Sequence, residues 1–116
     1  MSGMVEVPLN LPHVRVLGAN TEGKDLTVMV VSTLESATCT NCGERITELH
    51  SYEEPIRLRH LPCLGLRTWI ELRPKRFICQ RCPAAPIVTQ QLSWYEPHSQ
   101  HTKAFDDWLE PLYKTK

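Results

Sequence analysis

The sequence has no apolar run long enough to cross a membrane, and its first residues, MSGMVEVPLN, lack the basic start and apolar core of a signal peptide. We therefore expect a cytoplasmic protein with no membrane partner. In the reducing cytosol, paired cysteines are more often metal ligands than disulfides. Five cysteines in a chain of 116 residues are thus a reason to look for a metal site.

The sequence also lacks the motifs of common active sites, such as a nucleophile elbow, a phosphate-binding loop or a carboxylate set for a catalytic metal. Adjacent acids occur at Asp106 and Asp107. On a helix they would point about 100° apart, which favours two solvated side chains over a working pair. We expect no enzymatic activity and no small-molecule substrate.

Net charge is zero, but the charges are unevenly distributed along the chain. Residues 1–36 carry four acids and two bases, whereas residues 37–82 carry five acids and eight bases. Most of these bases fall in one block, with Glu71 as its single acid: Arg57, Arg59, Arg67, Arg73, Lys75, Arg76 and Arg81. Such a block is either a solvated face or an electrostatic footprint for phosphates.

Residues 1–36 are expected to form a β-hairpin. The β-branched runs VRVLG and DLTVMVVSTL flank ANTEGK, which contains turn residues. Both faces of the second run are partly apolar, so another part of the chain must cover the hairpin.

The middle part, residues 37–92, is expected to contain strands at Ile46–Tyr52, Pro55–Leu61 and Arg67–Arg73. In the last of these, RTWIELR alternates with the period of a half-buried strand. One face would join the core, and the other would carry arginines around Trp69.

The last part, residues 93–116, is expected to be helical. Its apolar residues follow helical spacing, at Phe105, Trp108, Leu109 and Leu112. Ser99 and Thr102 are candidate N-caps, and Pro111 is expected to end or kink the helix. The predicted fold class is therefore mainly β with a C-terminal helix.

Two Cys-x-x-Cys pairs account for four of the five cysteines, at Cys39, Cys42, Cys79 and Cys82. Two intervening residues let both thiolates of a pair face one point, and Gly43 permits the turn that follows the first pair. Four thiolates fit one structural Zn²⁺, and Arg76 and Arg81 would offset the net negative charge of a zinc bound by four thiolates. The gap between the pairs is longer than in compact fingers and would hold an inserted β-hairpin, giving a zinc-ribbon-like arrangement.

Other assignments of these residues remain open at this point. Two disulfides or a redox Cys-x-x-Cys are less favoured, because both pairs lie in turns between strands. Cys63 is left outside the zinc scheme and is expected to be an ordinary small residue. His50 and His60 lie between the pairs and are alternative ligands, although a core or surface role is favoured for each.

The order of these features resembles the N-terminal zinc-binding domain of bacterial insertion-sequence transposases of the ISL-three family. The similarity runs from the hairpin through CTNCG, ITELHSY and RLRHLPCLGLRTWIELRPKRFICQRCP. It extends to SWYEPHSQHTKAFDDWL, which resembles the start of the helix-turn-helix region that follows the finger. One departure is His60, where the family usually has an acidic residue.

The resemblance implies binding to the terminal inverted repeats of the element in the bacterial cytoplasm. The DNA contacts would come from Arg57, Arg59, Arg67, Trp69, Arg73, Lys75, Arg76 and Arg81. The family's catalytic domain, an RNase H-like fold with an Asp-Asp-Glu triad, would lie downstream, so this chain alone is not expected to cut DNA. Its neutral net charge predicts weak DNA binding without the helices that follow.

The alternative is a zinc-stabilised protein-interaction module, for example one that forms a homodimer. It is favoured by an aromatic content beyond the needs of a small core, at Trp69, Trp94, Tyr95, Phe105 and Trp108.

Overall fold

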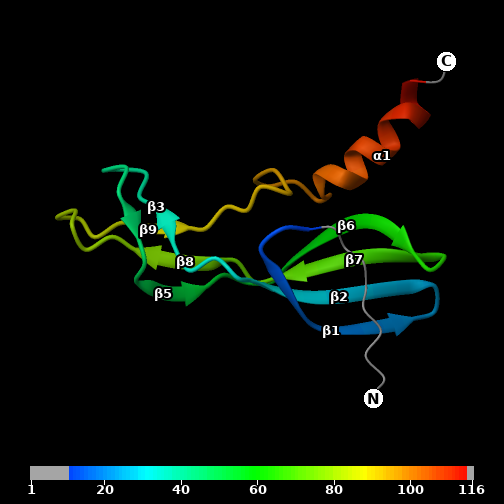
Figure 1. The fold of residues 1–116 in the computed structure, drawn as a ribbon, viewed down its shortest axis with the longest axis horizontal. Coiled ribbons are helices and arrows are strands. Elements are labelled where there is room, and N and C mark those ends of the chain that lie inside the picture. The colour runs from blue at the N-terminus through cyan, green and yellow to red at the C-terminus, as the bar shows by residue number, and fades with distance from the viewer. Residues whose placement is uncertain (1–10, 115–116) are drawn as a thin grey trace.

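The computed structural model describes the backbone of residues 11–114 and the side chains of residues 11–108. Most of this part of the chain is in strands, and one helix follows (Figure 1). The elements are β1 (Val14–Glu22), β2 (Asp25–Ser32), β3 (Ala37–Thr38), β4 (Arg45–Ile46), β5 (Leu49–Tyr52), β6 (Ile56–Cys63), β7 (Leu66–Leu72), β8 (Lys75–Ile78), β9 (Ile87–Thr89) and α1 (Lys103–Lys114). The predicted fold class, mainly β with a C-terminal helix, is confirmed.

The larger sheet has four strands in the order β1-β2-β7-β6. Two antiparallel hairpins, β1–β2 and β6–β7, join through the parallel pairing of β2 with β7 (Figure 1). From the sequence, the β6–β7 hairpin was expected to belong to the zinc-ribbon-like part that holds the cysteine pairs. It is hydrogen-bonded instead to the N-terminal hairpin, because the apolar faces of β2 and β7 belong to the same core.

The remaining strands form two small sheets, β3–β4 and β5-β8-β9, which we call the cysteine module. It lies beside the four-stranded sheet in Figure 1. The expected strand Ile46–Tyr52 is divided between β4 and β5, which pair with different partners. That expectation was wrong because the chain changes sheets between Ile46 and Leu49.

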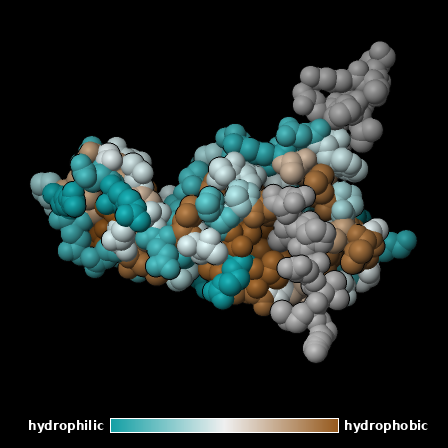
Figure 2. Space-filling model, in the orientation of Figure 1, coloured by the Kyte–Doolittle hydropathy of each residue, from teal (hydrophilic) through white to brown (hydrophobic). Residues whose placement is uncertain are grey.

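Each part has its own buried cluster. One face of the four-stranded sheet packs against the segment after β9, in a core of Leu26, Val28, Val30, Leu58, Ile70, Leu72, Leu92, Trp94 and Tyr95. The cysteine module is built around Cys39, Ile46, Phe77, Cys79 and Cys82. Figure 2 shows hydrophobic side chains gathered over the four-stranded sheet, whereas the cysteine module looks mostly hydrophilic from this side.

Helix α1 is attached to the free edge of β6. The backbone of Arg59 accepts a hydrogen bond from Thr102 N and donates one to Gln100 O, each 2.9 Å long. Thr102 is the N-cap, since its Oγ1 accepts from Phe105 N at 3.2 Å. The same hydroxyl lies 2.8 Å from Nδ1 of the buried His60. A capped helix end is thereby fixed to the sheet.

Two expectations about the C-terminal part were wrong. The helix continues through Pro111 to Lys114, so the expectation that Pro111 would end it was wrong. Trp94, Tyr95 and Phe105 are buried, so they are core residues and not spare aromatic surface. Trp108 is 47% exposed, whereas the side chains of Leu109 and Leu112 lie outside the described residues.

Candidate metal centre and nucleic-acid interface

The four paired cysteines come together at one point. Their Sγ atoms all lie within 4.8 Å of one another. The Cys39–Cys82 distance is 3.9 Å, and the Cys42–Cys79 and Cys79–Cys82 distances are 3.8 Å. A tetrahedron with Zn–S bonds of ~2.3 Å has edges of about 3.8 Å. The sulfur positions therefore fit one tetrahedral Zn²⁺.

The local backbone explains how the first pair is presented. After Cys42 the chain turns through Gly43 at a φ of +77°, a conformation that favours glycine. The turn is closed by a 2.9 Å hydrogen bond from Gly43 N to Cys39 O. Asn41 N points at Cys39 Sγ, 3.4 Å away. Amides of Cys42 and Asn41 lower the pKa of Cys39 from 9.0 to about 7, whereas burial and the neighbouring thiols raise the pKa of Cys42 to about 12, so Cys39 ionises before Cys42.

The site is closed, as a structural zinc site requires. Cys39, Cys79 and Cys82 are buried, and only Cys42 is exposed among the four. Four sulfur ligands leave no open coordination position for a reacting water. One structural zinc held by these cysteines would supply cross-linking of the two loops and no chemistry of its own.

The alternative ligands do not reach this site. Cys63 packs against the core of the four-stranded sheet. His50 Nδ1 lies 3.0 Å from Ser51 Oγ, and His60 is bonded to Thr102. Among the described residues, the cluster able to hold a metal consists of the four paired cysteines.

The block of bases does not form one surface. Arg57 and Arg59 lie on β6 beside Trp69 of β7, on the face of the four-stranded sheet opposite its core. Their Cζ atoms are 4.4 and 5.2 Å from the centroid of the Trp69 ring. The Cζ of Arg59 is also 5.0 Å from the Phe105 ring of α1. We call this row, Arg57, Trp69, Arg59 and Phe105, the arginine–aromatic stack.

Most of the other predicted contact residues are engaged with acids or backbone oxygens. Arg67 Nε lies 2.9 Å from Asp25, and Arg81 Nη1 lies 3.1 Å from Glu44. Arg73 and Arg76 both face Glu53, the first through its carbonyl oxygen at 3.1 Å and the second through its carboxylate at 3.9 Å. Their positive charges are therefore partly offset within the protein.

Lys75 is buried and points into the protein. Its Nζ donates to Leu34 O at 3.1 Å. On β8 it shares the inward face with Phe77, because side chains two apart in a strand point the same way. The two-residue spacing of Lys75 from Phe77 in the sequence could have indicated this inward position, whereas no local pattern identified Phe105 as a neighbour of the arginines.

Fold and site together define a small zinc-ribbon-like protein with a Cys₄ centre. Residues 35–82 match the family described as the zinc-finger of transposase IS204/IS1001/IS1096/IS1165. This segment, which contains both cysteine pairs and the β6–β7 hairpin, is similar to the zinc finger of that transposase family, and the resemblance seen in the sequence is confirmed. No curated protein and no solved structure matches the chain. In the described part of the chain, no helix is long and apolar enough to cross a membrane.

Proposed function

We propose that this chain is the DNA-binding part of an insertion-sequence transposase and that it recognises the terminal inverted repeats. The zinc-finger match supports the transposase assignment. Residues 93–116 would lead into the helix-turn-helix region, and cutting and joining of DNA would belong to an Asp-Asp-Glu domain elsewhere. The chain itself would act as a positioning element without catalysis.

The arginine–aromatic stack carries the proposal. Arg57 is exposed, and its Nη2 donates to Thr27 Oγ1 at 3.0 Å while its plane lies over Trp69. A stacked guanidinium keeps its position without an acid partner and leaves N–H groups for phosphates or guanine edges. Arg59 is half-buried, and its Nε has no hydrogen-bond partner among the described residues. That Nε is itself buried, so the exposed guanidinium of Arg57 is the cationic group that a phosphate would meet first.

The test is the salt dependence of binding to a duplex that contains the repeat ends. Each phosphate contact contributes about 0.9 to the slope of log K against log salt. Arg57→Ala should lower that slope by about one contact. Arg81→Ala is the matched control, because Arg81 is exposed but already paired with Glu44. An unchanged slope in Arg57→Ala, with zinc still bound, would refute the assignment of this surface to DNA.

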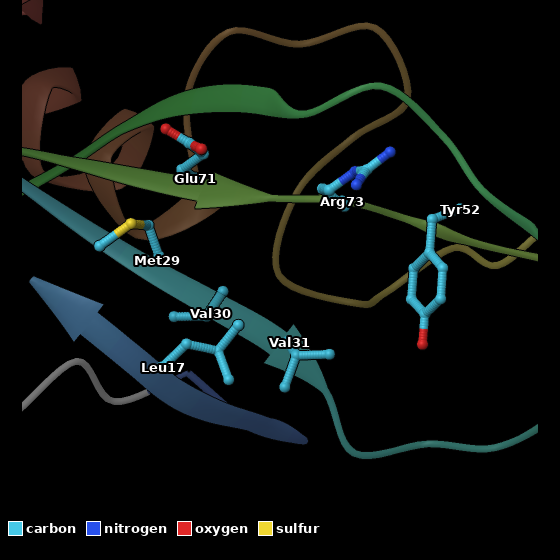
Figure 3. A pocket seen from close by; sticks show the side chains of 7 residues that line it. All are labelled: Leu17, Met29, Val30, Val31, Tyr52, Glu71 and Arg73. Atoms are coloured by element: carbon cyan, nitrogen blue, oxygen red, sulfur yellow. The ribbon is translucent and has the colours of Figure 1, made fainter.

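Self-association is a second candidate function, favoured by a groove of 460 Å³ (Figure 3). The groove lies beside β1, which pairs with no described strand other than β2. Its apolar and charged lining is formed by Leu17, Met29, Val30, Val31, Tyr52, Glu71 and Arg73.

A second copy of the chain is the occupant that suits this edge. Antiparallel pairing of two β1 strands would bring Arg15 of each copy near Glu22 of the other copy, which gives two equivalent ion pairs. A dimer in light scattering that Leu17→Asp converts to monomer would support this candidate. A monomer at all concentrations would remove it.

A further inference from the structure

Asn41 contacts both cysteine pairs at once. It lies between the two cysteines of the first pair, and its Nδ2 donates to Cys82 Sγ of the second pair at 3.2 Å. Its backbone N points at Cys39 Sγ at 3.4 Å. The side-chain contact joins residues 41 positions apart in the sequence, so it bridges the two loops that hold the metal.

This contact can stabilise the negative charge of a zinc bound by four thiolates, a role expected from the sequence for Arg76 and Arg81. Four thiolates around Zn²⁺ carry a net charge of about −2, and donors to sulfur stabilise that charge. Arg81 Nη1 lies 3.1 Å from Glu44, and Arg76 Nε lies 3.9 Å from Glu53. An amide N–H is a suitable replacement, because it donates to sulfur without an acid competing for it.

The position of Asn41 also matters for release of the metal. Zinc leaves when one pair swings away from the other, and that motion breaks the bond from Asn41 to Cys82. Asn41 is exposed, and Cys82, which accepts its bond, is buried. The bond therefore has to break before the first loop can separate from Cys82.

We propose that Asn41 is a positioning residue of the zinc centre, which holds the two cysteine pairs together through Cys82 and slows zinc release. Residues that orient metal ligands through hydrogen bonds typically change metal affinity 10–100-fold when they are replaced. The proposal concerns the metal centre alone and does not depend on DNA binding.

The test uses the zinc-loaded full chain and follows zinc transfer to a chromogenic chelator. Asn41→Ala should release zinc about 10-fold or more faster than the unchanged protein. Asn41→Asp should be faster still, because its carboxylate would face a thiolate. Thr40→Ala is the matched control: Thr40 is the exposed neighbour in the same loop, and its variant should behave like the unchanged protein.

A second measurement separates a lost hydrogen bond from general loosening. With Co²⁺ in place of zinc, loss of a donor to sulfur should move the thiolate-to-cobalt charge-transfer band of Asn41→Ala to longer wavelength. Thr40→Ala should leave the band in place. If Asn41→Ala is purified without metal while Thr40→Ala retains it, the proposal is also supported. Release within twofold of the unchanged protein, or an unshifted cobalt band, would overturn it.

Discussion

Removal of zinc should unfold the cysteine module and leave the four-stranded sheet folded. The metal ligands Cys39, Cys79 and Cys82 are themselves three of the buried residues of that module. The core of the four-stranded sheet contains none of the four ligands. Treatment of the reduced protein with a chelator therefore removes the metal that joins the buried cysteines of the cysteine module. It removes nothing from the core of the four-stranded sheet.

The free-energy contributions indicate that the cysteine module depends on the metal. Beside the cysteines, the module's buried cluster contains Ile46 and Phe77. Full burial of each contributes about 1.5–3 kcal/mol, whereas ordering each backbone residue costs about 1–2 kcal/mol. Its strands have only two to four residues each. A structural zinc contributes about 10–16 kcal/mol, so the metal is the dominant stabilising term in this module.

Hydrogen exchange with and without chelator measures the effect segment by segment. Protection should disappear in β5, β8 and β9 and remain in β2 and β7. Cys63→Ser is the control, since Cys63 is a cysteine outside the metal site and its variant should bind zinc normally. Retained protection in β8 would refute a stabilising role of zinc. Equal loss in β2 and β8 would show that the two parts unfold as one unit.

Three further predictions concern stability and binding. Thr102→Ala removes the helix cap, the bond to His60 and a buried methyl group, so urea unfolding should show a loss of about 3 kcal/mol. Thr102→Ser keeps the hydroxyl and should lose only about 1 kcal/mol, for the buried methyl group; equal stability of the two variants would contradict the cap. Phe77→Ala should cost about 3–5 kcal/mol in the zinc-bound protein, against less than about 0.5 for the exposed Ile87→Ala; similar costs would contradict the burial. Lys75→Gln should lower stability without changing the salt dependence of DNA binding, and a reduced slope would show that Lys75 reaches DNA.

Features set by neighbouring residues were predictable from the sequence. The two Cys-x-x-Cys spacings identified the four residues that converge, because each pair folds as a local turn. The alternation in RTWIELR correctly placed Thr68, Ile70 and Leu72 on the buried face of β7. The N-terminal hairpin also formed as expected, although β1 extends to Glu22.

Features that depend on distant partners were not predictable in this way. The parallel pairing of β2 with β7 joins strands about 40 residues apart, for example Val28 with Ile70, and no local pattern specifies it. Strands of two residues, such as β3 and β4, carry too little periodicity to be recognised. They persist because the metal site beside them holds their ends.

The candidate DNA-contacting residues were identified by charge, and charge alone does not show which side chains are free. Asp25 is far from Arg67 in sequence, yet the pairing of β2 with β7 places them opposite each other. Lys75 was named among the DNA-contacting residues because of its charge, although its two-residue spacing from Phe77 indicated an inward position. Strand alternation is therefore a better guide than charge density to the residues that can meet DNA here.

Zinc and the arginine–aromatic stack belong to different parts of the protein, so the metal cannot be what orders the stack directly. Two of the connections between these parts are β5–β6 and β7–β8, where Glu53 N donates to Pro74 O at 2.8 Å and Arg73 Nε donates to Glu53 O at 3.1 Å. These bonds close the base of the β6–β7 hairpin on the side of the cysteine module. If the sheet keeps its exchange protection in chelator, then Arg57 and Arg59 keep their positions over Trp69. Loss of DNA binding under those conditions would mean that the cysteine module touches DNA itself, whereas retained binding would assign the contact to the sheet.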